Sequence, residues 1–355
     1  MSNDTASSQG IVPILSYYTY IIFGHVNGLG VICAFALFGV FSNIANIIVY
    51  VKMGLSETVN ISLLTLSVSD LIASLSMLFL QIFVNPLVAP TRLPSGAFIE
   101  EIGYTTTCLL YPFLGLGACV TAILSIERCL CVITPLKGQR SLGMHYQGFE
   151  RKLKDRILDA QKIKSIVTPS RISVLLGVFF IYEAVLCTLM LVQTGPPYKS
   201  YNYKRLVYMA WSFTYPSTVC FVLISATTVF LVVRLRTHVS WRNQTTNQAS
   251  GGSVKELKAT RFVILICLMF ITCFSPNVAV SVVTLVYQEF TLQNPYFRWL
   301  VHVTFSSKLT FQTVSISTNA LVYYSMSTKY REVFREIFFK KRPTVRLSPY
   351  KTATE

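Results

Sequence analysis

The chain has 355 residues, of which 52% are hydrophobic and only 13% are charged. A soluble globular domain carries about 25% charged residues, so this composition indicates that much of the protein surface meets lipid rather than water. The formal net charge of +16 would suit nucleic acid. The basic residues, however, lie between long apolar stretches, which favours an anionic membrane surface as their partner. We therefore expect no nucleic-acid partner.

Seven apolar segments are each long enough to cross a bilayer as a helix. A span needs roughly 20 apolar residues, because a helix rises about 1.5 Å per residue and the hydrocarbon layer is about 30 Å thick. Seven such segments predict an all-α, multi-pass membrane protein with a seven-helix bundle. The segments are 29–51, 61–84, 105–132, 172–192, 206–233, 262–287 and 299–324.

The basic residues predict the orientation of these spans, because Lys and Arg collect on the cytoplasmic side of helical membrane proteins. Most of the 31 Lys and Arg residues fall within 134–171, within 234–261 and from Lys329 onward, which alternation of the spans places on one side. Residues 1–28 are then extracellular and the tail 341–355 is cytoplasmic, as expected for a plasma-membrane protein. The N-terminus lacks the basic start of a cleavable signal peptide, so the first span should act as the signal anchor. Asn3 begins a glycosylation sequon on the outer side.

Nine cysteines raise the question of a metal site or a disulfide framework. Most of them lie inside the apolar segments, where Cys behaves as a small hydrophobe. No cysteine spacing resembles that of a zinc site. We expect neither a metal nor another cofactor.

Three of the polar residues inside the apolar segments are informative: Asn43 in the first, Asp70 in the second and Asn319 near the inner end of the seventh. A polar side chain in a span is costly unless it is paired or hydrated. Each residue alone is explained by a hydrogen bond between helices. Together, at comparable depths on three spans, they predict a shared, hydrated polar core that can switch between bonding arrangements.

Glu127 and Arg128 close the third apolar segment at its inner end. One interpretation is an interfacial anchor, in which Arg128 extends toward lipid phosphate. The other is a latch, in which Glu127 holds Arg128 until a rearrangement frees it for a partner. Both interpretations remain open at this point.

Two further features concern helix shape. Pro276 removes a backbone hydrogen bond within the sixth segment and predicts a kink there. After the seventh segment, Tyr330, Phe334 and Ile337 recur at helical spacing among basic residues. This pattern predicts a short amphipathic eighth helix over 325–340 that lies on the inner leaflet.

Several motifs, in order along the spans, resemble those of the rhodopsin-like (class A) G-protein-coupled receptor family, from about Phe38 to Phe338. They are Asn43 in GVFSNIANIIVY, Asn60 with Asp70, ERCLCVITPL with Pro135, Pro216 in the fifth span, FITCFSP, and NALVY followed by YREVF. The stretches VNISLLTLSVSDL, SIERCLCVITPLK and MSTKYRE are similar to the molluscan, chiefly gastropod, chemosensory receptors. That group is close to the invertebrate neuropeptide receptors.

The resemblance implies a signal-transducing receptor domain over 29–324, not an enzyme. Binding of an extracellular small molecule or peptide would activate a heterotrimeric G protein, with a kinase and an arrestin as further partners. In the family's mechanism the sixth helix swings outward at its cytoplasmic end. Glu127 would restrain Arg128 until that movement opens the crevice for the G protein. The residues implied in coupling and activation are Glu127, Arg128, Pro135, Asp70, Asn43, Asn319, Tyr323, Phe270, Phe274 and Pro276.

The resemblance also places a ligand pocket in the outer half of the bundle. Leu110 occupies the position where amine receptors carry Asp, and Thr313 the position where opsins carry their retinal Lys, so neither ligand is expected. Lys308 could receive a carboxylate or could extend outward as an interfacial anchor. The candidate ligand-binding residues are Gln81, Tyr104, Leu110, Tyr111, Leu114, Asn277, Ser281, Lys308 and Gln312.

The chain departs from the family pattern at several positions. Phe274 replaces the Trp before the sixth-helix Pro, Ala320 replaces the seventh-helix Pro, and Cys129 replaces the Tyr after Arg128. The fourth span lacks the family's Trp and carries Glu183, for which we expect a protonated state or a bond to a neighbouring helix rather than a ligand contact.

Two larger departures concern the loops. Gly103 stands where the family has its outer disulfide Cys, and Cys108 lies about 7.5 Å deeper by helical rise. A disulfide needs Cα atoms within about 7 Å, so we expect no bond between Cys108 and Cys187. The second inner loop, 134–171, is enlarged by the stretch 138–163, which either an amphipathic helix on the leaflet or an intron retained in the gene model would explain.

Three alternatives differ in their requirements. A neuropeptide receptor would share the fold and the coupling residues. A transporter or channel could use Asp70, Glu183 and Lys308 as a charge path, but it would more often show inverted repeats or paired broken helices. An intramembrane hydrolase would need paired aspartates in the spans, and only Asp70 is present. The sequence favours a receptor over a transporter, a channel or a hydrolase.

Overall fold

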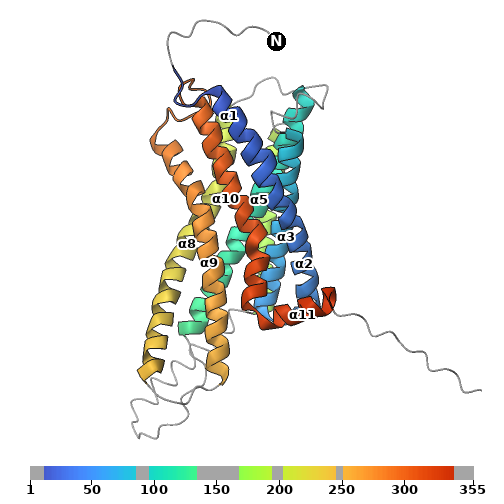
Figure 1. Ribbon diagram of the computed structural model, residues 1–355, viewed down its shortest axis with the longest axis vertical. Helices are drawn as coiled ribbons and strands as arrows, with labels where there is room; N and C mark the ends of the chain where they lie inside the picture. Colours follow the sequence, from blue (N-terminus) through green and yellow to red (C-terminus); the bar gives the residue numbers. More distant parts are fainter. Residues whose placement is uncertain (1–11, 85–95, 134–167, 194–202, 245–250, 340–355) are drawn as a thin grey trace, which may run out of the picture.

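The computed structural model describes residues 12–84, 96–133, 168–193, 203–244 and 251–339, and every regular element within these ranges is a helix (Figure 1). The elements are α1 (Tyr17–Phe23), η1 (Gly24–Ile32), α2 (Cys33–Met53), α3 (Thr58–Phe79), η2 (Leu80–Val84), α5 (Gly96–Ile133), α7 (Pro169–Gln193), α8 (Tyr203–Gln244), α9 (Gly251–Val286), α10 (Arg298–Met326) and α11 (Thr328–Phe338). Asn3, Pro135 and the stretch 138–163 lie outside the described residues, so the expectations for them stay predictions.

Within the described ranges, five helical segments are long and apolar enough to span a membrane: Tyr17–Met53, Thr58–Phe83, Thr105–Val132, Tyr215–Arg236 and Lys258–Val286. They coincide with five of the seven expected spans, which confirms a multi-pass membrane protein. The other two expected spans coincide with α7 and α10. These are helices, but their crossing of a membrane stays a prediction, because the apolar stretch of α7 is shorter and α10 is rich in Ser and Thr.

The first helical run begins earlier than the apolar pattern predicts. The Oγ atom of Ser16 accepts a hydrogen bond from the backbone N–H of Thr19 and caps α1. From there α1, η1 and α2 follow one another from Tyr17 to Met53, with a π-helical turn pattern over Gly24–Ile32. The expected span starts only at residue 29, because His25 and Asn27 lower the local hydropathy.

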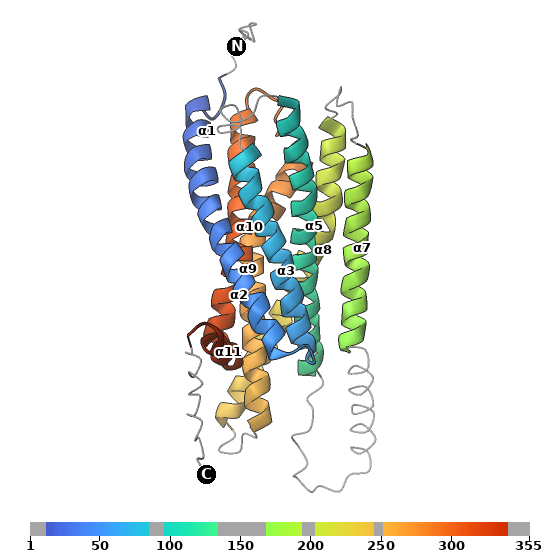
Figure 2. The same cartoon turned by 90° about the vertical axis from the view of Figure 1, so that its right-hand side faces the viewer.

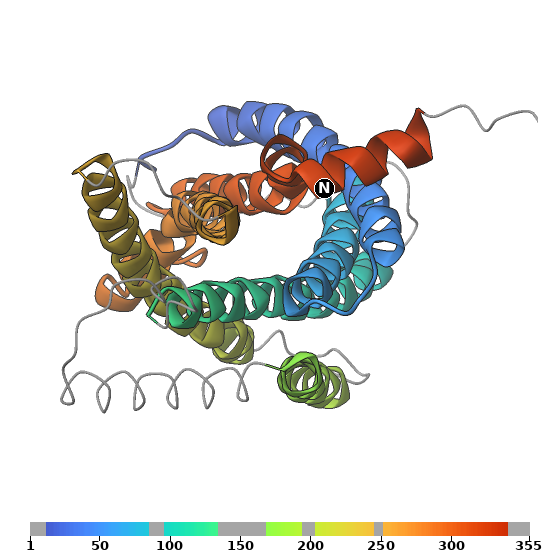
Figure 3. The same cartoon turned by 90° about the horizontal axis from the view of Figure 1, so that it is seen from below.

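The helices form a closed ring, in which α2 packs on α3, α3 on α5, α5 on α8, α8 on α9, α9 on α10 and α10 back on α2. Helix α7 lies outside this ring against α5 and α3 (Figures 2 and 3). Helices α1 and α11 lie at opposite ends of the bundle (Figure 2). Large apolar side chains face outward on several helices: Phe41 is 66% exposed, Val229 is 64% exposed and Leu285 is 63% exposed. Such a surface is unfavourable in water and suits a hydrocarbon solvent.

A line of polar contacts, which we call the α2–α10 seam, joins the first helical run to α10. The Asn27 side chain in η1 donates to Ser306 Oγ at 2.8 Å and accepts from Thr310 Oγ1 at 2.8 Å. Farther along, Ser42 Oγ donates to the Ser317 carbonyl at 3.1 Å, and Ser317 Oγ donates to the carbonyl of Phe35 at 2.7 Å. Because lipid offers no competing hydrogen bonds, these contacts hold the two helices in register.

Close helix packing is greatest at Gly39 of α2. A Cβ atom added there would lie 2.5 Å from Ser74 Oγ in α3 and 2.7 Å from Ser317 Oγ in α10. Small residues at such crossings allow backbones to approach each other in membrane bundles. Three helices therefore meet closely at this glycine, and a larger residue would require the two serine side chains to shift.

Helix α11 turns sharply away from α10 and crosses below the bundle (Figure 1). It spans Thr328–Phe338, within the predicted range 325–340, and the Oγ atom of Ser327 caps it by accepting from the Tyr330 N–H at 3.2 Å. Its Glu336 pairs with Lys52 of α2 at 3.1 Å. That pair is exposed, so it contributes little stability.

Candidate functional site

Asp70 of α3 and Asn319 of α10 meet inside the bundle. The Asn319 Nδ2 donates to Asp70 Oδ2 at 2.7 Å, and both side chains are buried. A buried polar pair of this kind is costly unless its members satisfy each other. The two residues thus come together as their depths in the sequence predict.

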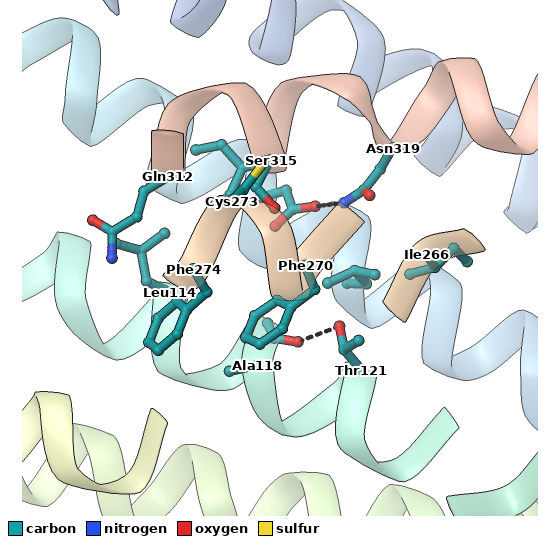
Figure 4. A pocket seen from close by; sticks show the side chains of 14 residues that line it. Leu114, Ala118, Thr121, Ile266, Phe270, Cys273, Phe274, Gln312, Ser315 and Asn319 are labelled. Atoms are coloured by element: carbon teal, nitrogen blue, oxygen red, sulfur yellow. Dashed lines mark hydrogen bonds between the residues drawn. The ribbon is translucent and has the colours of Figure 1, made fainter. Parts of the chain in front are cut away.

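A cavity lies beside this pair and reaches from Ile266 and Thr121 at one end to Gln312 and Leu114 at the other (Figure 4). It offers about 40 Å³ to the centres of water molecules, which is more than a single water requires. The cavity therefore has room for a small water cluster beside Asp70. Its lining comes from α3, α5, α9 and α10: Leu66, Asp70, Leu114, Gly117, Ala118, Thr121, Ile266, Phe270, Cys273, Phe274, Gln312, Ser315, Ile316 and Asn319.

Two aromatic rings of α9 form one wall of the cavity (Figure 4). The rings of Phe270 and Phe274 stack with centroids 5.1 Å apart and an interplanar angle of 12°. Phe274 also contacts Phe221 of α8 at 5.8 Å. Pro276 lies within α9, half a turn beyond Phe274. A molecule that enters or leaves the cavity beside these rings would act directly on the segment of α9 that carries Pro276.

Asn43 does not join Asp70 and Asn319. Its Nδ2 donates to the carbonyls of Gly39 at 2.9 Å and Ile316 at 3.0 Å, so it belongs to the α2–α10 seam. Three polar residues at comparable depths thus divide into two sites, because Asn43 points to the backbone of α10 whereas Asp70 points to a side chain of α10.

Asn43 begins a second chain of hydrogen bonds that the sequence did not reveal. Asn46 Nδ2 donates to Asn43 Oδ1 at 3.3 Å, and the Tyr330 hydroxyl of α11 donates to Asn46 Oδ1 at 2.6 Å. The only signal in the sequence is the i, i+3 spacing of the two asparagines. Tyr323 lies beside this chain, with its ring against Tyr50 at 5.6 Å and Tyr330 at 6.0 Å.

At the α11 end of the bundle, Glu127 and Arg128 form a long ion pair, with Arg128 Nη2 3.9 Å from Glu127 Oε1. The shorter contact of Glu127 is with α3, because Thr58 Oγ1 donates to Glu127 Oε1 at 2.6 Å. Among the described residues, Glu127 Oε2 and Arg128 Nε are buried without a hydrogen-bond partner. Arg128 is thus weakly held and has an unused donor. Thr58, which the sequence did not single out, also contacts the pair through Glu127.

The candidate ligand residues divide by position. Leu114 and Gln312 line the cavity, whereas Leu110 packs into an apolar cluster with Ile32 and Met77. The side chain of Tyr104 lies outside the description. The buried members are Gln81, Leu110, Asn277, Lys308 and Gln312, and the half-buried members are Tyr111, Leu114 and Ser281. The Ser281 hydroxyl bonds within its own helix, to the carbonyl of Asn277 at 2.8 Å.

Glu183 of α7 is 2% exposed, and neither carboxyl oxygen has a hydrogen-bond partner among the described residues. It faces Gly115 of α5, where its Oε1 lies 3.0 Å from the position that a Cβ would occupy. Of the two expected states, this placement favours a neutral, protonated carboxyl, because a buried charge without a partner is costly. The side chain of Cys187 is not described, so the absence of a disulfide to Cys108 stays a prediction. Within the described ranges, no group of three or more His, Cys, Asp or Glu residues could hold a metal ion.

One comparison with known proteins bears on this site. Residues 188–341 match the family model of the serpentine type 7TM GPCR chemoreceptor Srw. The matched region runs from the end of α7 through α11 and includes Phe270, Phe274, Asn319 and Tyr323. No curated protein matched the chain. The match and the membrane-spanning helices together support a multi-pass receptor of the GPCR chemoreceptor type, which is not an enzyme family.

Proposed function

We propose that the chain is a plasma-membrane receptor that converts binding of an extracellular chemical ligand into activation of a heterotrimeric G protein. In this proposal the α1 end faces outward, seven helices cross the bilayer, and α11 lies on the inner leaflet. The receptor is of the rhodopsin-like, class A kind and close to the molluscan chemosensory group. Phosphorylation by a receptor kinase and capture by an arrestin would end the signal.

The observation that carries this proposal is the cavity that joins Phe274 to the Asp70–Asn319 pair. A ligand held at its outer end acts on the stacked rings of α9. Movement of these rings tilts α9 about Pro276 and changes the room available to water beside Asp70. Buried polar networks of this kind respond to small displacements, because a lost hydrogen bond in a dry interior is expensive.

The output of the proposed mechanism is Arg128. Its ion pair with Glu127 is long at 3.9 Å, and its Nε lacks a partner among the described residues. When α9 moves away from α5, the guanidinium becomes available to the G protein. Arginine suits this role, because its donors form a rigid fork that stays charged at all physiological pH values.

The test is Arg128→Ala in cells that express a promiscuous Gα subunit, screened with dissolved odorants and short peptides. The wild-type receptor should catalyse ligand-evoked GTP exchange, and the variant should lose it while reaching the cell surface in equal amount. Lys52→Ala removes another inner basic side chain, 46% exposed in its ion pair, and should signal normally. Full signalling from Arg128→Ala would contradict the proposal. Ligand-evoked ion flux or uptake without GTP exchange would instead favour a channel or a transporter.

A further inference from the structure

We infer that the outer half of the bundle contains a subsite for an anionic group of the ligand, centred on Lys308 of α10. The anionic group is a carboxylate, a sulfonate or a phosphate. This inference rests on the proposed receptor function and adds the chemical class of the ligand. The main observation is the buried position of Lys308.

Lys308 is only 6% exposed. Among the described residues, no carboxylate forms an ion pair with it; the ion pairs found there involve Lys52, Arg128 and Lys329. A buried ammonium without a counter-charge is costly in a membrane protein, and such residues usually mark a ligand or ion pathway. An interfacial anchor would instead be largely exposed to water or headgroups, whereas Lys308 is buried among the helices.

The contacts of Lys308 compensate its charge only in part. The Nζ lies 4.7 Å from the ring centroid of Phe305 and 5.8 Å from that of Tyr111 in α5. Aromatic faces attract a cation, but they do not replace the acceptors that the three N–H groups of an ammonium require. An anion beside the Nζ would supply both the charge and the acceptors.

The subsite lies one helical turn from the cavity already described. Lys308 lies one helical turn beyond Gln312, and Tyr111 lies one turn beyond Leu114, on the side away from Asp70. Figure 4 shows Gln312 and Leu114 together at one end of the cavity, with Asn319 toward the other. The Oε1 of Gln312 is buried and has no hydrogen-bond partner within the described ranges. A ligand with an anionic head and a neighbouring donor group would satisfy both residues.

The acidic residues of the same helices are too distant to serve as internal partners. Asn319, which binds Asp70, lies about 16 Å along α10 from Lys308 at about 1.5 Å per residue. Glu101 of α5 lies about 15 Å along its helix from Tyr111, the α5 residue that contacts Lys308. Among the described residues, no carboxylate therefore pairs with Lys308, and an anion of the ligand would supply the counter-charge.

The experiment uses the full chain in lipid nanodiscs and measures thermal unfolding and GTP exchange in parallel. The probes are linear carboxylates from propanoate to octanoate, the matched alkyl sulfonates and phosphates, and the methyl esters of the same carboxylates. The variants are Lys308→Met, which keeps the length without the charge, and Lys308→Arg, which keeps the charge. Arg298→Met removes an exposed cation from the same helix and serves as the matched control.

At least one anion series should raise the unfolding temperature of the wild type, and its ester should not. In Lys308→Met the apparent affinity should fall at least about tenfold, whereas Lys308→Arg should retain much of it and Arg298→Met should match the wild type. The ligand-dependent shift is compared, because loss of a buried charge can itself change stability. Equal shifts for wild type and Lys308→Met, including no shift in either, would overturn the inference.

The two proposals fail in different ways. Anion-dependent stabilisation that is lost in Lys308→Met, without any GTP exchange, would keep the subsite and reject the signalling function. GTP exchange driven equally by neutral ligands in wild type and Lys308→Met would keep the signalling function and reject the subsite.

Discussion

The hydroxyl of Tyr330 in α11 donates a hydrogen bond of 2.6 Å to Asn46 Oδ1 in α2, and both side chains are buried. Burial also raises the pKa of Tyr330 above its ordinary value, so the phenol stays protonated and remains a donor. Through Asn43 the same chain reaches the carbonyl of Ile316 in α10. The position of the terminal helix is thus tied to the centre of the bundle by polar contacts.

Tyr330→Phe should loosen this attachment and leave the ring packing intact. The change leaves Asn46 Oδ1 buried without its donor, which costs about 1–3 kcal/mol. Hydrogen exchange in α11 should rise, and the unfolding temperature should fall. Tyr324→Phe is the control, because the Tyr324 hydroxyl has only an exposed contact of 3.4 Å with Arg335. Equal exchange in the two variants would show that the Tyr330 hydroxyl holds nothing in place.

Asn319→Ala should impair signalling more than Asp70→Asn. The first change removes the donor of the 2.7 Å bond and leaves Asp70 buried without its partner. The second keeps a carbonyl oxygen as an acceptor, so part of the bond survives. We expect a loss of ligand-evoked GTP exchange in Asn319→Ala at normal surface expression. Thr318→Ala is the neighbouring control, since its hydroxyl bonds within α10, and the prediction fails if that change is equally harmful.

Thr58→Val and Glu127→Gln should shift basal GTP exchange in opposite directions. The Thr58 hydroxyl occupies Glu127 Oε1 at 2.6 Å, whereas Arg128 stands 3.9 Å away. Without that donor, Glu127 is free to pair more closely with Arg128, so basal exchange should decrease. Loss of the charge in Glu127→Gln releases Arg128, so basal exchange should increase. Thr65→Val should be neutral because its hydroxyl bonds its own helix, and a common direction for the first two variants would refute the latch.

Gly39→Ala should destabilise the bundle although it adds a single methyl group. The new Cβ would lie 2.5 Å from Ser74 Oγ and 2.7 Å from Ser317 Oγ, and overpacking of this kind typically costs about 1–3 kcal/mol. The unfolding temperature in nanodiscs should fall. Gly177→Ala in α7 meets nothing within 4 Å and should be neutral or slightly stabilising. An unchanged unfolding temperature for Gly39→Ala would mean that the helices separate easily at this crossing.

The hydropathy of the sequence predicted where the helices lie, because the cost of placing an unsatisfied backbone in lipid is the dominant constraint on such a chain. It placed the start of the first helix too late. Asn27 and its neighbours look unsuitable for a span until the Asn27 side chain is seen to donate to Ser306 and to accept from Thr310. The sequence shows that a residue is polar. The free-energy cost of burying that residue, however, depends on a hydrogen-bond partner that only the packed bundle supplies.

The candidate site, like the helices, was only partly predictable from the sequence. Comparable depth in the spans correctly grouped Asp70 with Asn319 but wrongly added Asn43. The match over residues 188–341 supports the receptor type. The partners of Asn43 and Glu127 were not predictable, because the rotation of one helix against another decides whether a side chain faces a carbonyl, a hydroxyl or a charge. Thr58 and Asn46 were missed for this reason.

The α2–α10 seam holds α10 in register with α2, whereas α9 is the helix that can move. Sliding α10 along its neighbour would break the contacts of Asn27, Ser42 and Ser317 together. In the half of α9 nearer the α1 end, by contrast, the hydroxyls of Thr272 and Thr284 bond back to their own helix and do not tie α9 to a neighbour. Coupling between ligand sites is typically about 1–3 kcal/mol. A tilt of α9 breaks none of these seam contacts, so free energy of that size should move α9 before it moves α10 along the seam.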